Sequence, residues 1–187
     1  MTKASSRSEN VESEFKAAIR SVADFPKRGI MFRDITTLWK DARLLKKCTE
    51  VLYQHYKAAK IDSVLGIEAR GFVVGAPLAV RLGVGFIPLR KLGKLPGAKI
   101  SESYDLEYGT ATLEIHVDAV KKRERILIVD DLIATGGTAL AAAKLVEVLK
   151  GKVVGFAFVV EIAALKGREA LQGYDVFSIV KYASEED

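Results

Sequence analysis

Short apolar runs that alternate with segments of helical spacing constrain the fold of this chain more than any other feature. Five apolar runs are predicted to form strands, at residues 61–69, 84–90, 125–129, 152–162 and 174–182. Four segments have helical spacing: 9–22, 42–60, 72–83 and 138–150. Gly83 and Gly151 are suited to end two of these helices. Because apolar strands separated by helices are typical of parallel sheets buried on both faces, the pattern predicts an α/β fold with a mainly parallel sheet flanked by helices.

The size and apolar content of the chain predict one globular domain over residues 1–187. Its 187 residues are 49% hydrophobic and 28% charged, which is enough for a sizeable core. The sequence holds no apolar stretch long enough to span a bilayer and no signal region, so we expect a soluble cytoplasmic protein without a membrane partner. Cys48 is the only cysteine, which excludes an internal disulfide, fits a reducing compartment and predicts a buried thiol.

Basic residues give the chain a net charge of +5 and gather in three clusters, at residues 27–33, 90–99 and 121–125. Nucleic acid is one interpretation of such clusters. Gly and Pro interrupt two of them, however, and this layout also suits a flexible lid over a small polyanionic substrate. We therefore favour a small phosphate ligand over nucleic acid, and we expect residues 121–125 to form a solvated turn before a strand.

A glycine turn follows the third predicted strand, in the stretch RILIVDDLIATGGTALAAAKLV (125–146). Residues 130–137 connect this strand to a helix that is expected to start near Thr138. The start of a helix offers unbonded amide N–H groups and the positive end of the helix dipole, so it favours an anion. Glycines allow close approach of the backbone, and the hydroxyls of Thr135 and Thr138 are further donors. The turn is therefore predicted to bind phosphate.

Two adjacent carboxylates, Asp130 and Asp131, precede this turn and would repel a phosphate unless they meet another part of the same ligand. Vicinal hydroxyls or a hydrated divalent cation would serve, and a sugar phosphate supplies both conditions. The alternative interpretation is an acidic turn that caps a helix after a core strand.

The segment VDDLIATGGT (129–138) resembles the phosphoribosyl diphosphate motif of the type I phosphoribosyltransferases. Five further segments resemble the adenine branch of that family and follow its order along the chain: 24–36, 66–79, 90–97, 104–115 and 164–169. The resemblance implies the type I phosphoribosyltransferase fold, with a flexible hood over about residues 91–109 and an adenine-site segment over about residues 24–36.

The resemblance also implies how phosphoribosyl diphosphate is bound. The 5-phosphate is assigned to Ala134, Thr135, Gly136, Gly137 and Thr138, and the two ribose hydroxyls are assigned to Asp130 and Asp131. The diphosphate is assigned to Glu68, Ala69, Arg70, Arg90, Lys91 and Lys94. Many relatives carry Ser where this chain has Ala69, so the backbone is the only donor left at that position. Mg²⁺ is implied as the cofactor, held mainly by phosphoribosyl diphosphate and water rather than by named protein ligands.

The same resemblance places the adenine site and the catalytic groups. Phe32 would stack on the purine, the Met31 carbonyl and the Arg33 amide would read the 6-amino group and N1, and Ile162 would close the opposite face. Without the family, Phe32 is simply a core aromatic. The catalytic residues implied are Glu107, Arg70 and Tyr108.

The implied reaction is the Mg²⁺-dependent transfer of the 5-phosphoribosyl group from phosphoribosyl diphosphate to adenine N9, giving AMP and diphosphate in purine salvage. The resemblance further implies a homodimer. The sequence contains no distinct DNA-binding segment, so we expect no nucleic-acid partner. Two alternatives stay open at this point. One is a non-catalytic regulator that keeps the fold and the phosphate loop, and the other is an enzyme of the same fold that acts on hypoxanthine or guanine.

Overall fold

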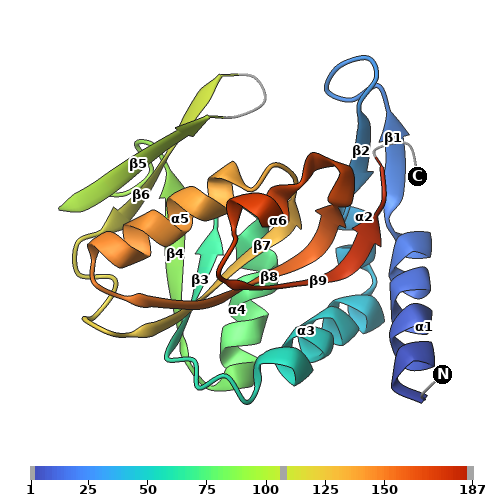
Figure 1. Cartoon of the computed structure of the whole chain (residues 1–187), viewed down its shortest axis with the longest axis horizontal. Coiled ribbons are helices and arrows are strands. Elements are labelled where there is room, and N and C mark those ends of the chain that lie inside the picture. Colours follow the sequence, from blue (N-terminus) through green and yellow to red (C-terminus); the bar gives the residue numbers. More distant parts are fainter. Residues whose placement is uncertain (1–2, 106–108, 185–187) are drawn as a thin grey trace.

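The centre of the molecule is a seven-stranded sheet with the strand order β5-β6-β4-β3-β7-β8-β9 (Figure 1). The structure is a computed structural model that describes residues 3–105 and 109–184. Five strands run parallel: β3 (Ser63–Ile67), β4 (Gly85–Lys91), β7 (Arg125–Ile133), β8 (Lys152–Ile162) and β9 (Asp175–Tyr182). Two antiparallel strands extend one edge: β5 (Lys99–Asp105) and β6 (Thr110–His116). The predicted α/β fold with a mainly parallel sheet is therefore confirmed.

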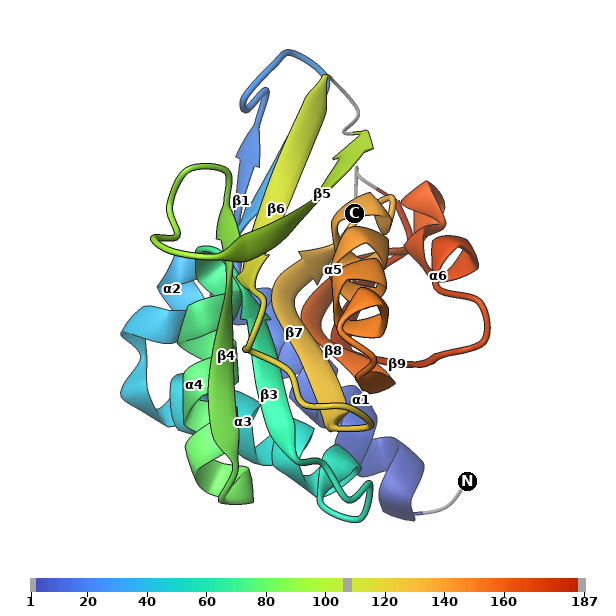
Figure 2. The ribbon, with the colours of Figure 1, turned by 90° about the vertical axis from the view of Figure 1, so that its left-hand side faces the viewer.

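Helices cover both faces of this sheet (Figure 2). One face carries α1 (Lys3–Ala18), α2 (Thr36–Lys40), α3 (Ala42–Tyr56) and α4 (Arg70–Leu82), and the other carries α5 (Gly137–Val148) and the short α6 (Gly167–Ala170), which follows the 3-10 turn η1 (Ala163–Leu165). A separate antiparallel pair is formed by β1 (Arg20–Ala23) and β2 (Met31–Asp34). This pair and the β5–β6 pair both extend beyond the carboxyl ends of the parallel strands (Figures 1 and 2).

Strand β7 shows why the central strands are apolar in their middle part. Leu127 and Val129 pack into the core beneath α1–α4, whereas Ile126 and Ile128 pack into the core beneath α5. All four side chains are fully buried. Because successive residues of a strand face opposite sides of the sheet, the part of a strand that helices cover on both faces favours apolar side chains at every position.

The end of β7 differs from the sequence-based expectation. The strand continues to Ile133, and its pairing places Asp130 opposite Phe158 of β8. Asp130 and Asp131 therefore lie on a strand rather than in a turn, because pairing with β8 extends beyond the apolar run. The following helix starts at Gly137 rather than at residue 138.

Two helices end four residues earlier than expected, and the helix predicted over residues 138–150 ends two residues early, at Val148. The helix predicted over residues 9–22 ends at Ala18, and residues 20–23 form β1 instead. The helix predicted over residues 42–60 ends at Tyr56. The expected end of the next helix is confirmed, since Gly83 follows α4 in a left-handed conformation with φ of +74°.

The segment 91–109, expected to be a long loop, contains strand β5. Residues 99–105 pair with 110–116 from Lys99 opposite His116 to Asp105 opposite Thr110. The stretch KISESYD lacks an apolar run because it lies at the edge of the sheet, where polar side chains are tolerated. The expectation of a loop is therefore wrong for residues 99–105, and the connection between β4 and β5 is residues 92–98.

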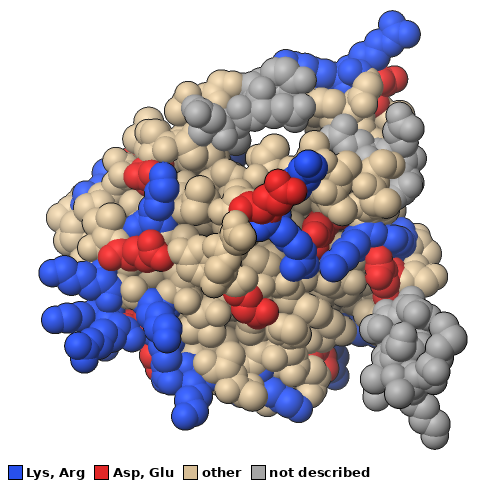
Figure 3. Space-filling model, in the orientation of Figure 1, with Lys and Arg blue, Asp and Glu red and all other residues tan. Residues whose placement is uncertain are grey.

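The basic cluster at residues 121–125 forms an exposed turn before β7, as expected. Lys121, Lys122 and Arg123 are exposed, and Nη2 of Arg125 lies 2.5 Å from Oδ1 of Asp62. Figure 3 shows Lys and Arg side chains gathered at the lower left, over the end of the molecule where this turn lies in Figure 1. This is the amino end of the parallel strands, opposite to the end that carries the glycine turn.

The thiol of Cys48 is buried within α3, as expected, and this burial raises its pKa to about 12. Within residues 3–105 and 109–184, none of the helices combines the length and the apolar character needed to cross a membrane.

Candidate active site

The strand order reverses between β3 and β7, so a crevice is expected at the carboxyl ends of these two strands. Residues 68–70 follow β3, and the end of β7 carries Asp130 and Asp131. A cavity of about 380 Å³ lies at this point, and its wall includes Arg70 and both aspartates. The topology thus brings together two segments that lie about sixty residues apart in the sequence.

The predicted phosphate loop forms another wall of this cavity. The cavity is lined by Ala134, Thr135, Gly136 and Thr138, whereas Gly137 is the first residue of α5 and does not line it. Gly136 stands at the N-cap of α5 with φ of +84°, a conformation that favours glycine. Because glycine brings no side chain to cap the helix, the first amides of α5 remain available to an anion.

The two adjacent carboxylates occupy different environments. The side chain of Asp131 is almost fully buried, and its Oδ2 lies 2.5 Å from Nε of Arg70. The backbone N–H of Asp131 donates to Oδ1 of Asp130 at 2.8 Å. Burial, together with the negative charge of Asp131, raises the pKa of Asp130. The fold therefore holds two carboxylates side by side, and this arrangement disfavours the charged form of Asp130.

Arg70 connects the acidic pair to the predicted adenine segment. It is the first residue of α4, and its guanidinium carbon lies 5.7 Å from the centroid of the Phe32 ring. The side chain of Arg70 is 47% exposed, so it is able to change partners. The diphosphate role assigned to Arg70 stays a prediction, since in this structure it pairs with Asp131.

The remaining residues assigned to the diphosphate are arranged around Glu68. Its carboxylate accepts from Nε of Arg90 at 2.9 Å and from the backbone N–H of Lys91 at 2.8 Å. The hydrogen bond from Arg90 lowers the pKa of Glu68. Ala69 is the N-cap residue of α4, and the side chains of Lys91 and Lys94 are exposed. Glu68 and Arg90 therefore tie the loop after β3 to strand β4.

The adenine segment contains strand β2 of the β1–β2 pair, where Phe32 is half-buried and packs edge-on against Phe25 with ring centroids 5.1 Å apart. Strand β2 pairs with β1 along one edge, and no other described strand pairs with its second edge. Because backbone groups alternate in direction along a strand, some of those in residues 31–34 face away from β1. These outward-facing N–H and carbonyl groups include candidates for hydrogen bonds with the edge of a base.

Arg33 and Ile162 are linked through the last strand. The Arg33 side chain is buried, donates to Oγ of Ser21 at 2.6 Å and lies over the ring of Tyr182, 4.0 Å from its centroid. Ile162 is buried at the end of β8, opposite Tyr182 in the sheet. Tyr182 thus contacts Arg33 of the adenine segment and pairs with Ile162 in the sheet.

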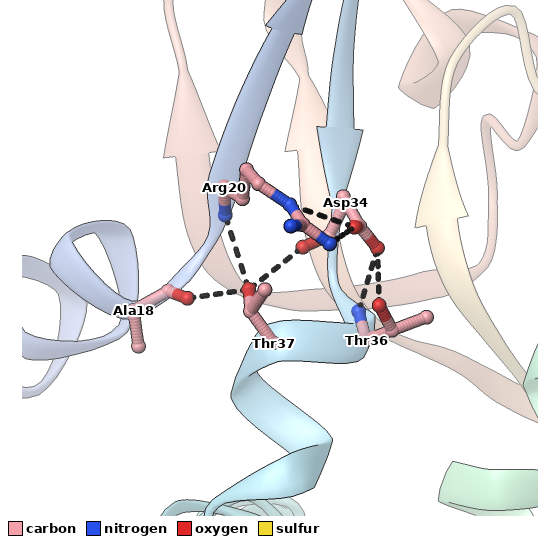
Figure 4. A network of polar contacts seen from close by, with 5 residues as sticks. All are labelled: Ala18, Arg20, Asp34, Thr36 and Thr37. Carbon is pink, nitrogen blue, oxygen red and sulfur yellow. Dashed lines mark hydrogen bonds and ion pairs between the residues drawn. The ribbon is translucent and has the colours of Figure 1, made fainter.

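A polar network fixes the base of the β1–β2 pair (Figure 4). The Asp34 carboxylate accepts from Nη2 of Arg20 and from Oγ1 of Thr36, both at 2.5 Å. These hydrogen bonds, that from Thr36 most strongly, lower the pKa of Asp34. Oγ1 of Thr37 lies 2.6 Å from the Ala18 carbonyl oxygen and 3.1 Å from the amide nitrogen of Arg20. The segment after α1 is therefore held where Phe32 lies near the cavity.

Glu107 and Tyr108 lie outside the described residues. The strands on either side of them are anchored by Glu114 of β6, which sequence reasoning did not single out. Its buried carboxylate accepts from the backbone N–H of Gly93 at 2.9 Å and lies 3.4 Å from Nζ of Lys99. The sequence signal for Glu114 is its place as an acidic residue between two apolar residues, in the stretch LEI.

Comparison with known proteins agrees with this geometry. A family model described as a phosphoribosyl transferase domain matches residues 35–185. The sheet order and the glycine loop at the strand-order reversal thus belong to a phosphoribosyltransferase.

Individual relatives show to which kind of phosphoribosyltransferase this chain is similar. The adenine phosphoribosyltransferase of Halothermothrix orenii is 52% identical over 168 residues, which cover 90% of this chain and 99% of the relative. The crystal structure of adenine phosphoribosyltransferase from Thermoanaerobacter pseudethanolicus matches with a TM-score of 0.88 at 52% identity, covering 91% of this chain and 99% of that chain. The Saccharomyces cerevisiae structure, complexed with adenine and an imino-altritol bisphosphate, has a TM-score of 0.85 at 39% identity, with coverages of 91% and 99%. This chain belongs to the adenine phosphoribosyltransferase family, the pentosyltransferases of adenine salvage, so its expected class as an enzyme is confirmed.

Proposed function

We propose that this enzyme transfers the 5-phosphoribosyl group of phosphoribosyl diphosphate to N9 of adenine, giving AMP and diphosphate, with Mg²⁺ as cofactor. The observation that carries the proposal is the position of Arg70, 2.5 Å from Asp131 of the acidic pair and 5.7 Å from the Phe32 ring. One side chain thus joins the sugar-phosphate cavity to the base segment. The adenine bound in the Saccharomyces cerevisiae relative supports this choice of base.

The ribose 5-phosphate part of the substrate is assigned to the end of β7 and the start of α5. Residues 134–138 hold the phosphate through backbone N–H groups and the hydroxyls of Thr135 and Thr138. Asp130 and Asp131 accept hydrogen bonds from the two ribose hydroxyls. When these hydroxyls meet Asp131, the half-exposed Arg70 is free to leave that carboxylate and pair with the diphosphate.

The diphosphate lies over the loop after β3 in this proposal. Backbone N–H groups at Ala69 and Arg70 donate to it, and Glu68 with Arg90 fixes the loop rather than touching the ligand, because their side chains are already paired. Lys91 and Lys94 are exposed and approach the diphosphate charge from the hood side. Positioning and electrostatic stabilisation of this leaving group are the main catalytic tasks.

The acidic pair also fits a hydrated Mg²⁺, because carboxylate oxygens are the hard ligands that this ion prefers and Mg²⁺ keeps much of its water. We propose that the ion is held mainly by phosphoribosyl diphosphate and water, with Asp130 and Asp131 within reach of its water ligands. When bound, the ion supplies neutralisation of the charge that develops on the departing diphosphate.

The base is assigned to the β2 segment. Phe32 stacks on the purine, and the Met31 carbonyl accepts from the 6-amino group while the Arg33 amide donates to N1. Backbone groups of this polarity favour an amine over the 6-oxo group of hypoxanthine or guanine. Ile162 closes the opposite face.

The anomeric carbon passes through an oxocarbenium-like state as diphosphate leaves, and adenine loses a proton. Glu107 is the candidate for managing that proton near N7 or N9, and Tyr108 closes over the reacting centre with the hood. A cytoplasmic homodimer completes the proposal, on the strength of the family resemblance.

Diphosphate release measured side by side with adenine, hypoxanthine and guanine tests this function. We expect release with adenine and phosphoribosyl diphosphate only, and loss of release when Mg²⁺ is chelated. Faster diphosphate release with hypoxanthine or guanine would show that the enzyme acts on that base rather than on adenine. No release with any base, at unchanged binding of phosphoribosyl diphosphate, would favour the non-catalytic regulator.

A further inference from the structure

The segment after β8 lies directly behind the phosphate loop, yet the proposed reaction gives it no task. It comprises η1 (Ala163–Leu165) and α6 (Gly167–Ala170) and has the sequence ALKGRE at 164–169. Figure 2 shows α6 beside the start of α5 on the same face of the sheet. Its position there rests on two observations, a backbone contact and an ion pair with a buried carboxylate.

The backbone contact joins two glycines. A Cβ atom built at Gly136 would lie 2.5 Å from the Gly167 carbonyl oxygen. A Cβ atom built at Gly167 would lie 2.3 Å from the Ala134 carbonyl oxygen and 2.7 Å from the Ile133 side chain. Both distances are too short for any side chain, so α6 touches the phosphate loop backbone to backbone.

The ion pair anchors α6 to the sheet. Nε and Nη2 of Arg168 lie 2.6 and 2.7 Å from the two carboxylate oxygens of Glu161, a bidentate arrangement. The same guanidinium donates from Nη1 to the Val176 carbonyl at 2.6 Å and lies 3.4 Å from Oγ of Ser178. Glu161 is buried in β8, opposite Ile133 at the end of β7. One arginine thus connects α6 to both β8 and β9.

A four-residue helix has too few internal hydrogen bonds to hold its own position, so the place of α6 depends on tertiary contacts, among them those of Arg168. The phosphate loop in turn has a glycine at the helix N-cap, which allows several backbone conformations unless a neighbour restricts them. Gly167 is that neighbour. The geometry of the 5-phosphate amides therefore depends on side chains that lie behind them.

We propose that Arg168 and Glu161 are positioning residues, which press Gly167 against the phosphate loop and thereby set its affinity for the 5-phosphate of the substrate. The inference rests on the proposed function, since it takes residues 134–138 as the 5-phosphate site. Neither side chain touches the ligand in this account.

Isothermal titration with two probes separates the phosphate loop from the diphosphate loop. Ribose 5-phosphate carries only the group that residues 134–138 would bind, and diphosphate with Mg²⁺ reports on residues 68–70. In Arg168→Gln, we expect binding of ribose 5-phosphate to weaken about tenfold, the size of effect typical of residues that act through a neighbour. Binding of diphosphate should stay within about twofold. Arg168→Lys keeps the positive charge but loses the two-point contact of the guanidinium, so its affinity for ribose 5-phosphate should lie between those of wild type and Arg168→Gln.

Two matched controls lie elsewhere in the fold. Arg125 forms a comparable two-point pair with Asp62 at the opposite end of β7, so Arg125→Gln should leave ribose 5-phosphate affinity unchanged even if it lowers Tm. Gly167→Ala should weaken the binding of ribose 5-phosphate as Arg168→Gln does. Gly85→Ala is its control, because a Cβ there would meet only Oγ of Ser63 at an ordinary 3.4 Å.

The outcomes separate this inference from the proposed function. Wild-type affinity for ribose 5-phosphate in folded Arg168→Gln and Gly167→Ala would overturn the positioning role and leave the phosphate site standing. Equal weakening of ribose 5-phosphate and diphosphate would also overturn it, because a general loss of structure acts on both loops. Failure of the wild-type protein to bind ribose 5-phosphate would overturn the assignment of residues 134–138, and the positioning role with it.

Discussion

Replacing Asp130 with asparagine is expected to slow catalysis and to stabilise the fold in the same variant. Burial, together with the adjacent charge of Asp131, raises the pKa of the Asp130 carboxyl, so the charged form is disfavoured in the folded protein. Asparagine has nearly the same shape without the charge. Its side-chain oxygen still accepts from the Asp131 N–H, which lies 2.8 Å from Oδ1 of Asp130.

The gain in stability has a defined dependence on pH. Below the pKa of the unfolded chain, about 4, both states hold the proton and Asp130 costs nothing. Between that value and the raised folded-state pKa, the unfolded chain releases its proton while the folded protein keeps it, so native stability falls as the pH rises. The advantage of Asp130→Asn grows through this window and then levels off. Each unit of pKa elevation is worth about 1.4 kcal/mol, which corresponds to about 3–6 °C in Tm for a chain of this length.

Turnover is expected to move the other way. A hydrogen bond from a ribose hydroxyl to a carboxylate contributes about 1.5–3 kcal/mol, and a neutral amide loses most of the charge-assisted part. Since about 1.4 kcal/mol corresponds to a factor of ten, kcat/KM for phosphoribosyl diphosphate should fall about 10- to 100-fold.

Thermal melts over the acidic to neutral pH range, combined with steady-state kinetics, check both effects. Asp131→Asn is the matched control, because it removes the partner of Arg70 and should lose activity without the gain in Tm. A lowered Tm for Asp130→Asn at neutral pH would refute the argument from burial. An unchanged kcat/KM would refute the ribose role.

Three further predictions concern the hood and the support of the site. Glu107→Gln keeps the size of the side chain but not its basicity, so kcat and kcat/KM for adenine should fall together by about 10²- to 10⁴-fold; a normal kcat with a raised adenine KM would make Glu107 a binding residue instead. Trypsin should cleave after the exposed Lys94 faster than after Lys99, whose ammonium donates to a backbone carbonyl at 2.7 Å, and phosphoribosyl diphosphate with Mg²⁺ should slow the cut after Lys94. Equal cleavage with and without ligand would exclude closure of a lid. Burial raises the pKa of Glu161, but the hydrogen bonds from Arg168 lower it, and the net shift is downward. The charged Glu161 therefore stabilises the fold above the unfolded-state pKa of about 4.3, and this stabilisation is lost as the pH falls through the folded-state pKa. Glu161→Gln should therefore lower Tm at neutral pH, with a difference that shrinks in acid; a difference that stays constant with pH would contradict this cause.

Local pattern was enough to predict the central strands and the glycine turn between β7 and α5. Residues 126–129 are apolar at every position because this part of β7 is buried on both faces, a pattern typical of the strands of a parallel sheet. The glycine pair at 136–137 follows within a few residues, so the loop and the helix start are encoded in one contiguous stretch. The adenine segment, in contrast, was assigned through resemblance, since Phe32 has no local feature that separates a base-stacking ring from a core ring.

Local pattern failed where pairing with a distant strand decides the structure. Strand β5 carries Ser and Glu on an exposed edge, so its sequence has the composition of a loop. Asp130 and Asp131 are turn-forming residues by composition, yet β8 extends the ladder past them to Ile133. In both cases hydrogen bonds to a partner strand outweigh the preference of the residues themselves.

The sequence by itself determined which residues form the predicted phosphate loop, because amide donors, glycines and hydroxyls lie within ten consecutive positions. Only the tertiary structure decided what stands around that loop. Arg70 reaches Asp131 because the strand order reverses between β3 and β7, and Gly167 meets Gly136 because Arg168 is tied to Glu161 on a neighbouring strand. The contacts of Arg70 with Asp131 and of Gly167 with Gly136 join residues about sixty and about thirty positions apart, and their geometry follows from the order and register of the strands rather than from any local preference of the chain.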